Sequence, residues 1–244
     1  MKQKLKTAIV IGVGPLNGLG AQLGVRFAQR GLRTYVAGRT QANVDAVASF
    51  IRDQGHDAIG VATDARDSRS ISSLFDVATA NENELTLAIY NVGNNTPGRL
   101  SEMDPDYFEA SWRTCCFGGF LFAQAAVNRM SPIGGTVLFT GASASMRGRA
   151  NFGAFNSGKG ALRLMAQALS KECGPDGIHV GHVVIDGPIG GDKIIKGIPQ
   201  YAEQVGEAGL IDLQGIVDAY EYLYDQPRRA WTFEVDVRTS IEKW

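Results

Sequence analysis

Short runs of apolar and β-branched residues alternate with helical hydrophobic patterns along the whole chain. Seven of these runs have the length of buried strands: 7–11, 34–37, 58–62, 85–91, 136–140, 178–185 and 232–237. Between the second and third runs, Val44, Val47 and Ile51 recur at the spacing of one helix face, and Gly55 supplies a helix stop. Such alternation predicts an α/β fold with a doubly wound, seven-stranded parallel sheet and helices on both faces.

The strand and helix pattern continues without a linker, a repeat or a low-complexity tract, so we expect one domain spanning residues 1–244. The segment 187–209 breaks the rhythm, because Pro188, Gly190, Gly191 and Pro199 fall between the sixth run and the next helix. Two hypotheses explain it: a mobile lid over a substrate pocket, or a plain surface loop.

Composition narrows the classes of partner. Lysine and arginine number 24 against 25 aspartates and glutamates, a formal net charge of −1, so the positive field needed for nonspecific nucleic-acid or anionic-membrane binding is missing. No apolar run reaches the roughly 18 residues of a membrane span. The three cysteines include neighbours Cys115 and Cys116, which would strain a mutual disulfide. We expect a soluble cytoplasmic protein without nucleic-acid, membrane or metal partners.

A glycine-rich turn follows the first predicted strand and opens a helix, in the sequence VGPLNGLG at 13–20. Glycines allow the backbone to approach a pyrophosphate, and the helix N-terminus offers N–H groups to the anion. We therefore predict that the turn binds a dinucleotide through Gly14, Asn17, Gly18, Leu19 and Gly20. The alternative is a tight strand-to-helix turn in which the glycines are only structural.

The residue after the second predicted strand bears on the choice of cofactor. A dinucleotide site that prefers NAD places an acid there, but the chain has Arg39, and no carboxylate follows until Asp45. A guanidinium suits a 2′-phosphate, so Arg39 favours NADP(H) over NAD(H). The alternative is an exposed arginine in a turn.

These motifs together resemble the short-chain dehydrogenase/reductase family over essentially the whole chain. The glycine turn matches the family's TGxxxGxG except that Val13 replaces the threonine. Asp64 matches an acid that accepts from the adenine amino group, Asn91 and Gly93 match the NAG after the fourth strand, and Lys159 matches the lysine of YxxxK. The resemblance implies a Rossmann fold, a nicotinamide cofactor and a small-molecule substrate.

The resemblance breaks at the catalytic positions. The family's tyrosine, four residues before the lysine, acts as general acid or base, but Phe155 stands there and has no proton to give. The family's serine aligns with Ala142, so Ser143 could replace it only if the loop shifts by one residue. The structural asparagine of the middle helix aligns with Cys116, which we interpret as a small apolar residue. Of the four catalytic positions, only Lys159 has the residue that the family has there.

A carboxylate stands where the family has a Pro-Gly pair edging the nicotinamide. The pair here is Asp186-Gly187, and the resemblance implies cofactor contacts from Gly187 and Ile189. Asp186 either exchanges protons with the substrate or caps the following turn. His182, in the same strand, is interpreted as a core residue, and so is Tyr90 at the end of the fourth strand.

Small residues crowd the helix around Lys159, and interior glycines need an offsetting contact, either within the fold or between subunits. Family members pair their two long middle helices, here 106–130 and 152–171, so a homodimer or homotetramer is implied. An apolar or aromatic substrate is suggested by five side chains, Phe117, Phe120, Met146, Phe152 and Phe155.

Three hypotheses for the function remain open. The first is an NADP-dependent oxidoreductase for a carbonyl or alcohol, with the proton supplied by Asp186, Ser143 or water. The second is a non-redox lyase or isomerase on the same scaffold, with Asp186 as base. The third is an NADP-binding sensor without turnover.

Overall fold

The computed structural model describes residues 4–131 and 133–243, and within them seven parallel strands form one sheet. The strands are β1 (Lys6–Ile11), β2 (Arg33–Gly38), β3 (Ala58–Ala62), β4 (Glu84–Tyr90), β5 (Gly135–Thr140), β6 (Ile178–Asp186) and β7 (Glu234–Arg238). All seven predicted strands are present, and their ends differ from the predicted ones by no more than two residues.

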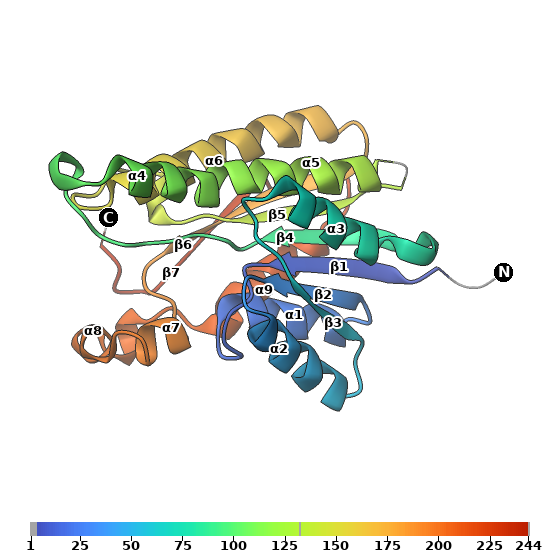
Figure 1. Ribbon diagram of the computed structural model, residues 1–244, viewed down its shortest axis with the longest axis horizontal. Helices are drawn as coiled ribbons and strands as arrows, with labels where there is room; N and C mark the ends of the chain where they lie inside the picture. The colour runs from blue at the N-terminus through green and yellow to red at the C-terminus, as the bar shows by residue number, and fades with distance from the viewer. Residues whose placement is uncertain (1–3, 132, 244) are drawn as a thin grey trace.

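Helices cover both faces of this sheet (Figure 1). They are α1 (Leu19–Gln29), α2 (Gln41–Asp53), α3 (Ser68–Ala78), α4 (Pro105–Trp112), α5 (Gly118–Met130), α6 (Gly153–Cys173), α7 (Asp192–Ile195), α8 (Pro199–Val205) and α9 (Leu213–Tyr224). One buried cluster joins the sheet to α1, α2 and α9, and a second joins it to α3, α5 and α6. The predicted doubly wound α/β fold is therefore confirmed.

The strand order is β3-β2-β1-β4-β5-β6-β7, so it reverses direction between β1 and β4. In open parallel sheets, ligands bind beyond the carboxyl ends of the strands at such a reversal. Figure 1 shows α7 and α8 on the side of the molecule toward which the arrowhead of β1 points. The segment 187–209 therefore lies at the edge where a ligand is expected, and it contains the short helices α7 and α8.

The predicted middle helix 106–130 is interrupted by a wider turn. Between α4 and α5 the chain forms a π-helical turn, η3 (Arg113–Phe117). The buried hydroxyl of Tyr90 donates to the Thr114 carbonyl of this turn at 2.6 Å. A β-carbon at Gly118 would lie 2.5 Å from the same hydroxyl, so this position accepts only glycine. Tyr90 is thus a core residue, as predicted.

The glycines of α6 have two different surroundings. A β-carbon at Gly158 would lie 2.7 Å from Cβ of Cys115, so this glycine allows α6 to approach η3 closely. A β-carbon at Gly160 would meet no described atom within 4 Å. Close packing within the fold therefore explains Gly158, whereas Gly160 faces open space.

Candidate cofactor and substrate site

The glycine-rich turn lies at the reversal point of the sheet, between β1 and α1. Gly18 precedes α1, and no described side chain caps the first N–H groups of this 11-residue helix. An uncapped helix N-terminus offers N–H groups and a positive partial charge to a phosphate. A β-carbon at Gly20 would lie 2.6 Å from the Gly12 carbonyl oxygen, whereas one at Gly14 would meet no described atom within 4 Å. Leu19, the first residue of α1, is buried.

Asn91 supports the turn from the end of β4. Its Nδ2 donates to the Gly12 carbonyl at 3.2 Å, and its Oδ1 accepts from the Thr140 hydroxyl at 2.9 Å. The Thr140 hydroxyl in turn lies 2.6 Å from the hydroxyl of Tyr220 in α9, and because Thr140 donates to Asn91, Tyr220 is the donor in this pair. Burial raises the pKa of Tyr220, so it keeps its proton. Asn91 therefore acts as a brace for the turn.

Asn17 connects the turn to the segment 187–209. Its Nδ2 donates to Oδ1 of Asp192 at 3.1 Å, and its carbonyl accepts from the Asp192 N–H at 2.8 Å. Ile189 forms an isolated parallel bridge with Ile211, and the Ile211 side chain also packs beside Gly187. The structure thus brings three predicted cofactor residues together with the start of α7.

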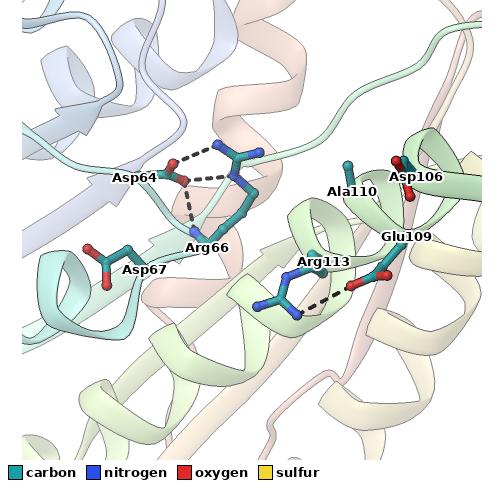
Figure 2. Close-up of a pocket in the computed structure, with 7 residues that line it drawn as sticks. All are labelled: Asp64, Arg66, Asp67, Asp106, Glu109, Ala110 and Arg113. Atoms are coloured by element: carbon teal, nitrogen blue, oxygen red, sulfur yellow. Dashed lines mark hydrogen bonds and ion pairs between the residues drawn. The ribbon is translucent and has the colours of Figure 1, made fainter.

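Arg39 and Asp64 follow neighbouring strands at the same edge of the sheet. The pKa of the Asp64 carboxyl lies below its usual value, mainly because Arg66 donates hydrogen bonds to it. The positive charge of Arg39 lowers the same pKa to a smaller extent. Arg66 donates through Nε to Oδ1 at 3.1 Å and through Nη2 to Oδ2 at 2.7 Å. Figure 2 shows this pair opposite a second pair formed by Glu109 and Arg113. Both pairs line a cavity of about 430 Å³.

Lys159 lies in α6, where it is 3% exposed. Its Nζ donates to the Thr140 carbonyl at 2.7 Å and to the Val92 carbonyl at 3.1 Å. Burial is the main cause that lowers the pKa of the ammonium. Phe155 lies one helical turn earlier, with its ring centre 5.9 Å from Nζ, and a β-carbon at Gly93 would come 3.3 Å from Nζ. The structure therefore brings Lys159, Phe155 and Gly93 close together.

Asp186 ends β6 and is 2% exposed. Its two oxygens accept from Nη2 of Arg147 at 3.1 and 3.2 Å. Neither sequence hypothesis for Asp186 included this ion pair. Ser143 begins the 3-10 turn η4 (Ser143–Ser145), and its carbonyl accepts from the Arg147 N–H at 3.1 Å. Ser143 and Asp186 are therefore connected through Arg147.

His182 is fully buried, as expected for a core residue. Its Nδ1 lies 2.9 Å from Oε2 of Glu234, which also accepts from Arg163 at 2.6 Å. Burial lowers the pKa of His182 to about 4, which outweighs the opposing effect of Glu234, so the ring is neutral at neutral pH. Burial also raises the pKa of Cys116, in agreement with its interpretation as an unreactive apolar residue.

The five apolar side chains predicted to line the substrate pocket have different surroundings. Phe117 stacks on Trp112 with ring centres 6.3 Å apart, and Phe120 follows at 6.1 Å from Phe117. Phe120 and Met146 are 42% and 44% exposed. Phe152 lies under the Arg149 guanidinium, and Phe155 lies beside Lys159. Trp112 at the end of α4, Phe117 in η3 and Phe120 in α5 thus form a row of neighbouring aromatic rings.

Several residues at the site have no counterpart among the predicted ones. They are Arg66, Thr140, Arg147, Asp192 and Tyr220. Thr140 could have been found, because it is a polar residue at the carboxyl end of a predicted strand. Arg66 could also have been found, because it lies two residues after the predicted Asp64. Arg147, Asp192 and Tyr220 meet their partners through the fold, and no local spacing indicates those contacts.

Two classes of structure are absent from residues 4–131 and 133–243. No three histidine, cysteine, aspartate or glutamate side chains of this part gather closely enough to hold a metal ion. No helix of this part combines the length and the apolar composition that crossing a membrane requires.

Comparison with known proteins adds an independent observation. A family model described as short chain dehydrogenase matches residues 6–189. Versicolorin reductase stcU of Emericella nidulans is 27% identical over 197 residues, 80% of this chain and 74% of that protein. Elsinochrome reductase 1 of Elsinoe fawcettii is 27% identical over 184 residues, 75% of this chain and 68% of that protein.

Solved structures resemble nearly the whole chain. A short-chain dehydrogenase from Rhodopseudomonas palustris superposes with a TM-score of 0.82 at 30% identity, covering 96% of this chain and 98% of that one. An alcohol dehydrogenase from the archaeon Thermococcus sibiricus, complexed with 5-hydroxy-NADP, reaches a TM-score of 0.84 at 18% identity and shares the fold, covering 98% of this chain and 99% of that one.

Proposed function

The chain belongs to the short-chain dehydrogenase family, and from this premise we propose that it is an NADP(H)-dependent oxidoreductase that interconverts a carbonyl compound and an alcohol. The observation that carries the proposal is that three groups lie along the same carboxyl edge of the sheet: the uncapped α1 N-terminus after β1, Arg39 after β2, and Lys159 at the ends of β4 and β5. Together they offer an anion site, a guanidinium and a buried ammonium. Fungal relatives named as reductases support the redox assignment.

Each of these groups has a part in holding the cofactor. The N–H groups after Gly18 bind the pyrophosphate, Arg39 binds the 2′-phosphate, and Lys159 orients the nicotinamide ribose. The Asp64 carboxylate can accept from the adenine amino group only if it shares its oxygens with Arg66. The bound cofactor supplies or accepts the hydride.

The proton must come from a group other than the family's tyrosine, because Phe155 occupies that position. Asp186, Ser143 and water are the candidates, and Arg147 contacts both residues, through the Asp186 carboxylate and the Ser143 backbone carbonyl. A positioned general acid contributes about 10²- to 10⁴-fold, so its loss slows reduction without preventing hydride transfer. The segment 187–209 serves as a lid over an apolar or aromatic substrate.

Two other functions remain as alternatives. A lyase or isomerase would use Asp186 as base and would change its substrate without a change in nicotinamide absorbance. A sensor would bind NADP(H) without turnover, and the contact of Phe155 with Lys159 favours it, because that contact leaves the ammonium without a neighbouring acid. For each function we expect a cytoplasmic homodimer or homotetramer.

The test mixes purified protein with NADPH and a panel of ketones, aldehydes and quinones, and follows nicotinamide absorbance. The wild type is compared with Phe155→Tyr and with Phe50→Tyr, a control on α2. Oxidation of NADPH by the wild type supports the proposal. If only Phe155→Tyr turns over, the native chain is not an oxidoreductase, and mass spectrometry of the panel distinguishes a lyase from a sensor.

A further inference from the structure

The ion pair at the end of β6 combines a buried acid with a more exposed base. The Asp186 side chain is 3% exposed and that of Arg147 is 38% exposed. A buried carboxylate is costly to keep charged unless it is paired, so Asp186 fixes the direction of the guanidinium. Arg238 is also near enough for its charge to interact with Asp186, so this carboxylate balances more than one positive charge.

The backbone of Arg147 is fixed on two sides. Its N–H donates to the Ser143 carbonyl at 3.1 Å, and its carbonyl accepts from Nδ2 of Asn156 at 2.7 Å. The same Nδ2 donates to the Ala144 carbonyl at 3.0 Å. Because Asn156 follows Phe155 in α6, the loop that carries Arg147 is tied to the helix turn where the family has its acid.

We propose that Arg147 binds the carbonyl oxygen of the substrate and stabilises the negative charge that develops there, and that Asp186 is its positioning residue. The inference rests on the proposed oxidoreductase function. A hydride from NADPH, which is thereby oxidised to NADP⁺, adds to the carbonyl carbon, and the π-electron pair moves to oxygen. The resulting alkoxide takes a proton from water, which leaves hydroxide. A guanidinium does not release a proton in proteins, but its five N–H groups allow one of them to face the substrate while Asp186 accepts from another.

This arrangement explains how a site with Phe155 could still reduce a carbonyl. A fixed hydrogen-bond donor lowers the barrier by electrostatics and needs no change of its own protonation state. Orientation by a buried carboxylate keeps the guanidinium from swinging into solvent, which is the role of supporting residues at preorganised sites.

The experiment uses a substrate probe and an oxyanion probe. Wild type, Arg147→Met, Arg147→Lys and the neighbouring control Arg149→Met are assayed with NADPH and 9,10-phenanthrenequinone. Binding of 4-nitrophenolate is titrated by absorbance in the presence of NADP⁺, and NADPH affinity is measured by fluorescence. We expect Arg147→Met to lower kcat by about 10²- to 10³-fold, to weaken phenolate binding at least about 10-fold and to leave NADPH affinity unchanged. The lysine variant should recover only part of the loss, and Arg149→Met should behave as wild type.

A double variant separates this role from folding. Removing Arg147 alone takes the partner from a buried carboxylate, so Arg147→Met is also combined with Asp186→Asn, which removes that charge. If Asp186 acts through Arg147, the double variant is no slower than Arg147→Met. A double variant slower than Arg147→Met would refute the positioning role.

Failure of this proposal and failure of the proposed function give different results. A wild type that binds no phenolate, or binds it equally well without Arg147, overturns the present inference even if NADPH is oxidised. If the wild type oxidises no NADPH but binds phenolate, and Arg147→Met loses that binding, the redox function is overturned and the oxyanion site remains supported.

Discussion

Replacing Gly20 by alanine should damage both the fold and the cofactor site. The new β-carbon would lie 2.6 Å from the Gly12 carbonyl oxygen and 3.0 Å from Nδ2 of Asn91. Overpacking of this kind costs about 1–3 kcal/mol, and loss of the Asn91 to Gly12 hydrogen bond adds about 1 kcal/mol. Alanine recovers about 0.4–1 kcal/mol by restricting the unfolded chain. The net loss of unfolding free energy is about 2 kcal/mol, equivalent to about 4–8 °C in Tm.

Gly14→Ala is the matched control, because a β-carbon there meets no described atom within 4 Å. Its unfolding free energy should stay within about 0.5 kcal/mol of wild type, apart from the stabilisation that alanine adds by reducing the conformational entropy of the unfolded chain. Both variants should bind NADPH more weakly, since each places a methyl group in the turn. Calorimetry and fluorescence titration measure the two effects. If Gly20→Ala were as stable as Gly14→Ala, the close contact of the turn with α1 would be wrong.

Three further predictions concern separate parts of the site. Arg39→Leu should weaken NADPH binding about 10- to 100-fold and leave NADH binding unchanged, because only the former carries a 2′-phosphate; equal losses in parallel fluorescence titrations would contradict this assignment. Because burial lowers the pKa of His182 to about 4, the unfolded chain binds a proton that the folded chain lacks between that pH and the usual His value. Stability should therefore fall as pH decreases from about 6.5 to 4, by up to about 3 kcal/mol, and denaturant titrations should show a smaller fall for His182→Gln. Tyr90→Phe removes the hydrogen bond to the Thr114 carbonyl and should cost about 1 kcal/mol in the same titrations; an unchanged midpoint would show that the bond adds nothing.

The fold could be predicted from sequence because its signals are local. Each strand is a short apolar run, and each helix repeats its buried face within a few residues, as Val44, Val47 and Ile51 do in α2. The end of α2 was also predictable from the glycine at position 55, because the backbone there has a φ of +84°, which glycine adopts readily. The π-helical turn between α4 and α5 was missed, because the hydrophobic pattern barely changes when one turn widens.

The site was only partly predictable for the opposite reason. The glycine turn, Asn91 and Lys159 follow spacings that a sequence displays. Arg147, the partner of Asp186, lies 39 residues away in a loop without a distinctive pattern, so only the structure shows that the two residues pair. The same holds for Asp192, whose contact with Asn17 spans 175 residues. The order of the strands brings these distant charged residues together, and the hydrophobic pattern of the sequence predicts local elements but not their order in the sheet.

The brace beneath the glycine turn has a consequence for the order in which the protein matures. The Gly12 carbonyl depends on Asn91, Asn91 on Thr140, and Thr140 on Tyr220 in α9. As the chain leaves the ribosome, the first βαβ unit exists long before residue 220 is made. Nascent chains that end before α9 would therefore carry the nucleotide motif with Asn91 and Thr140 but without Tyr220, so the last hydrogen bond of the brace forms only near the end of synthesis.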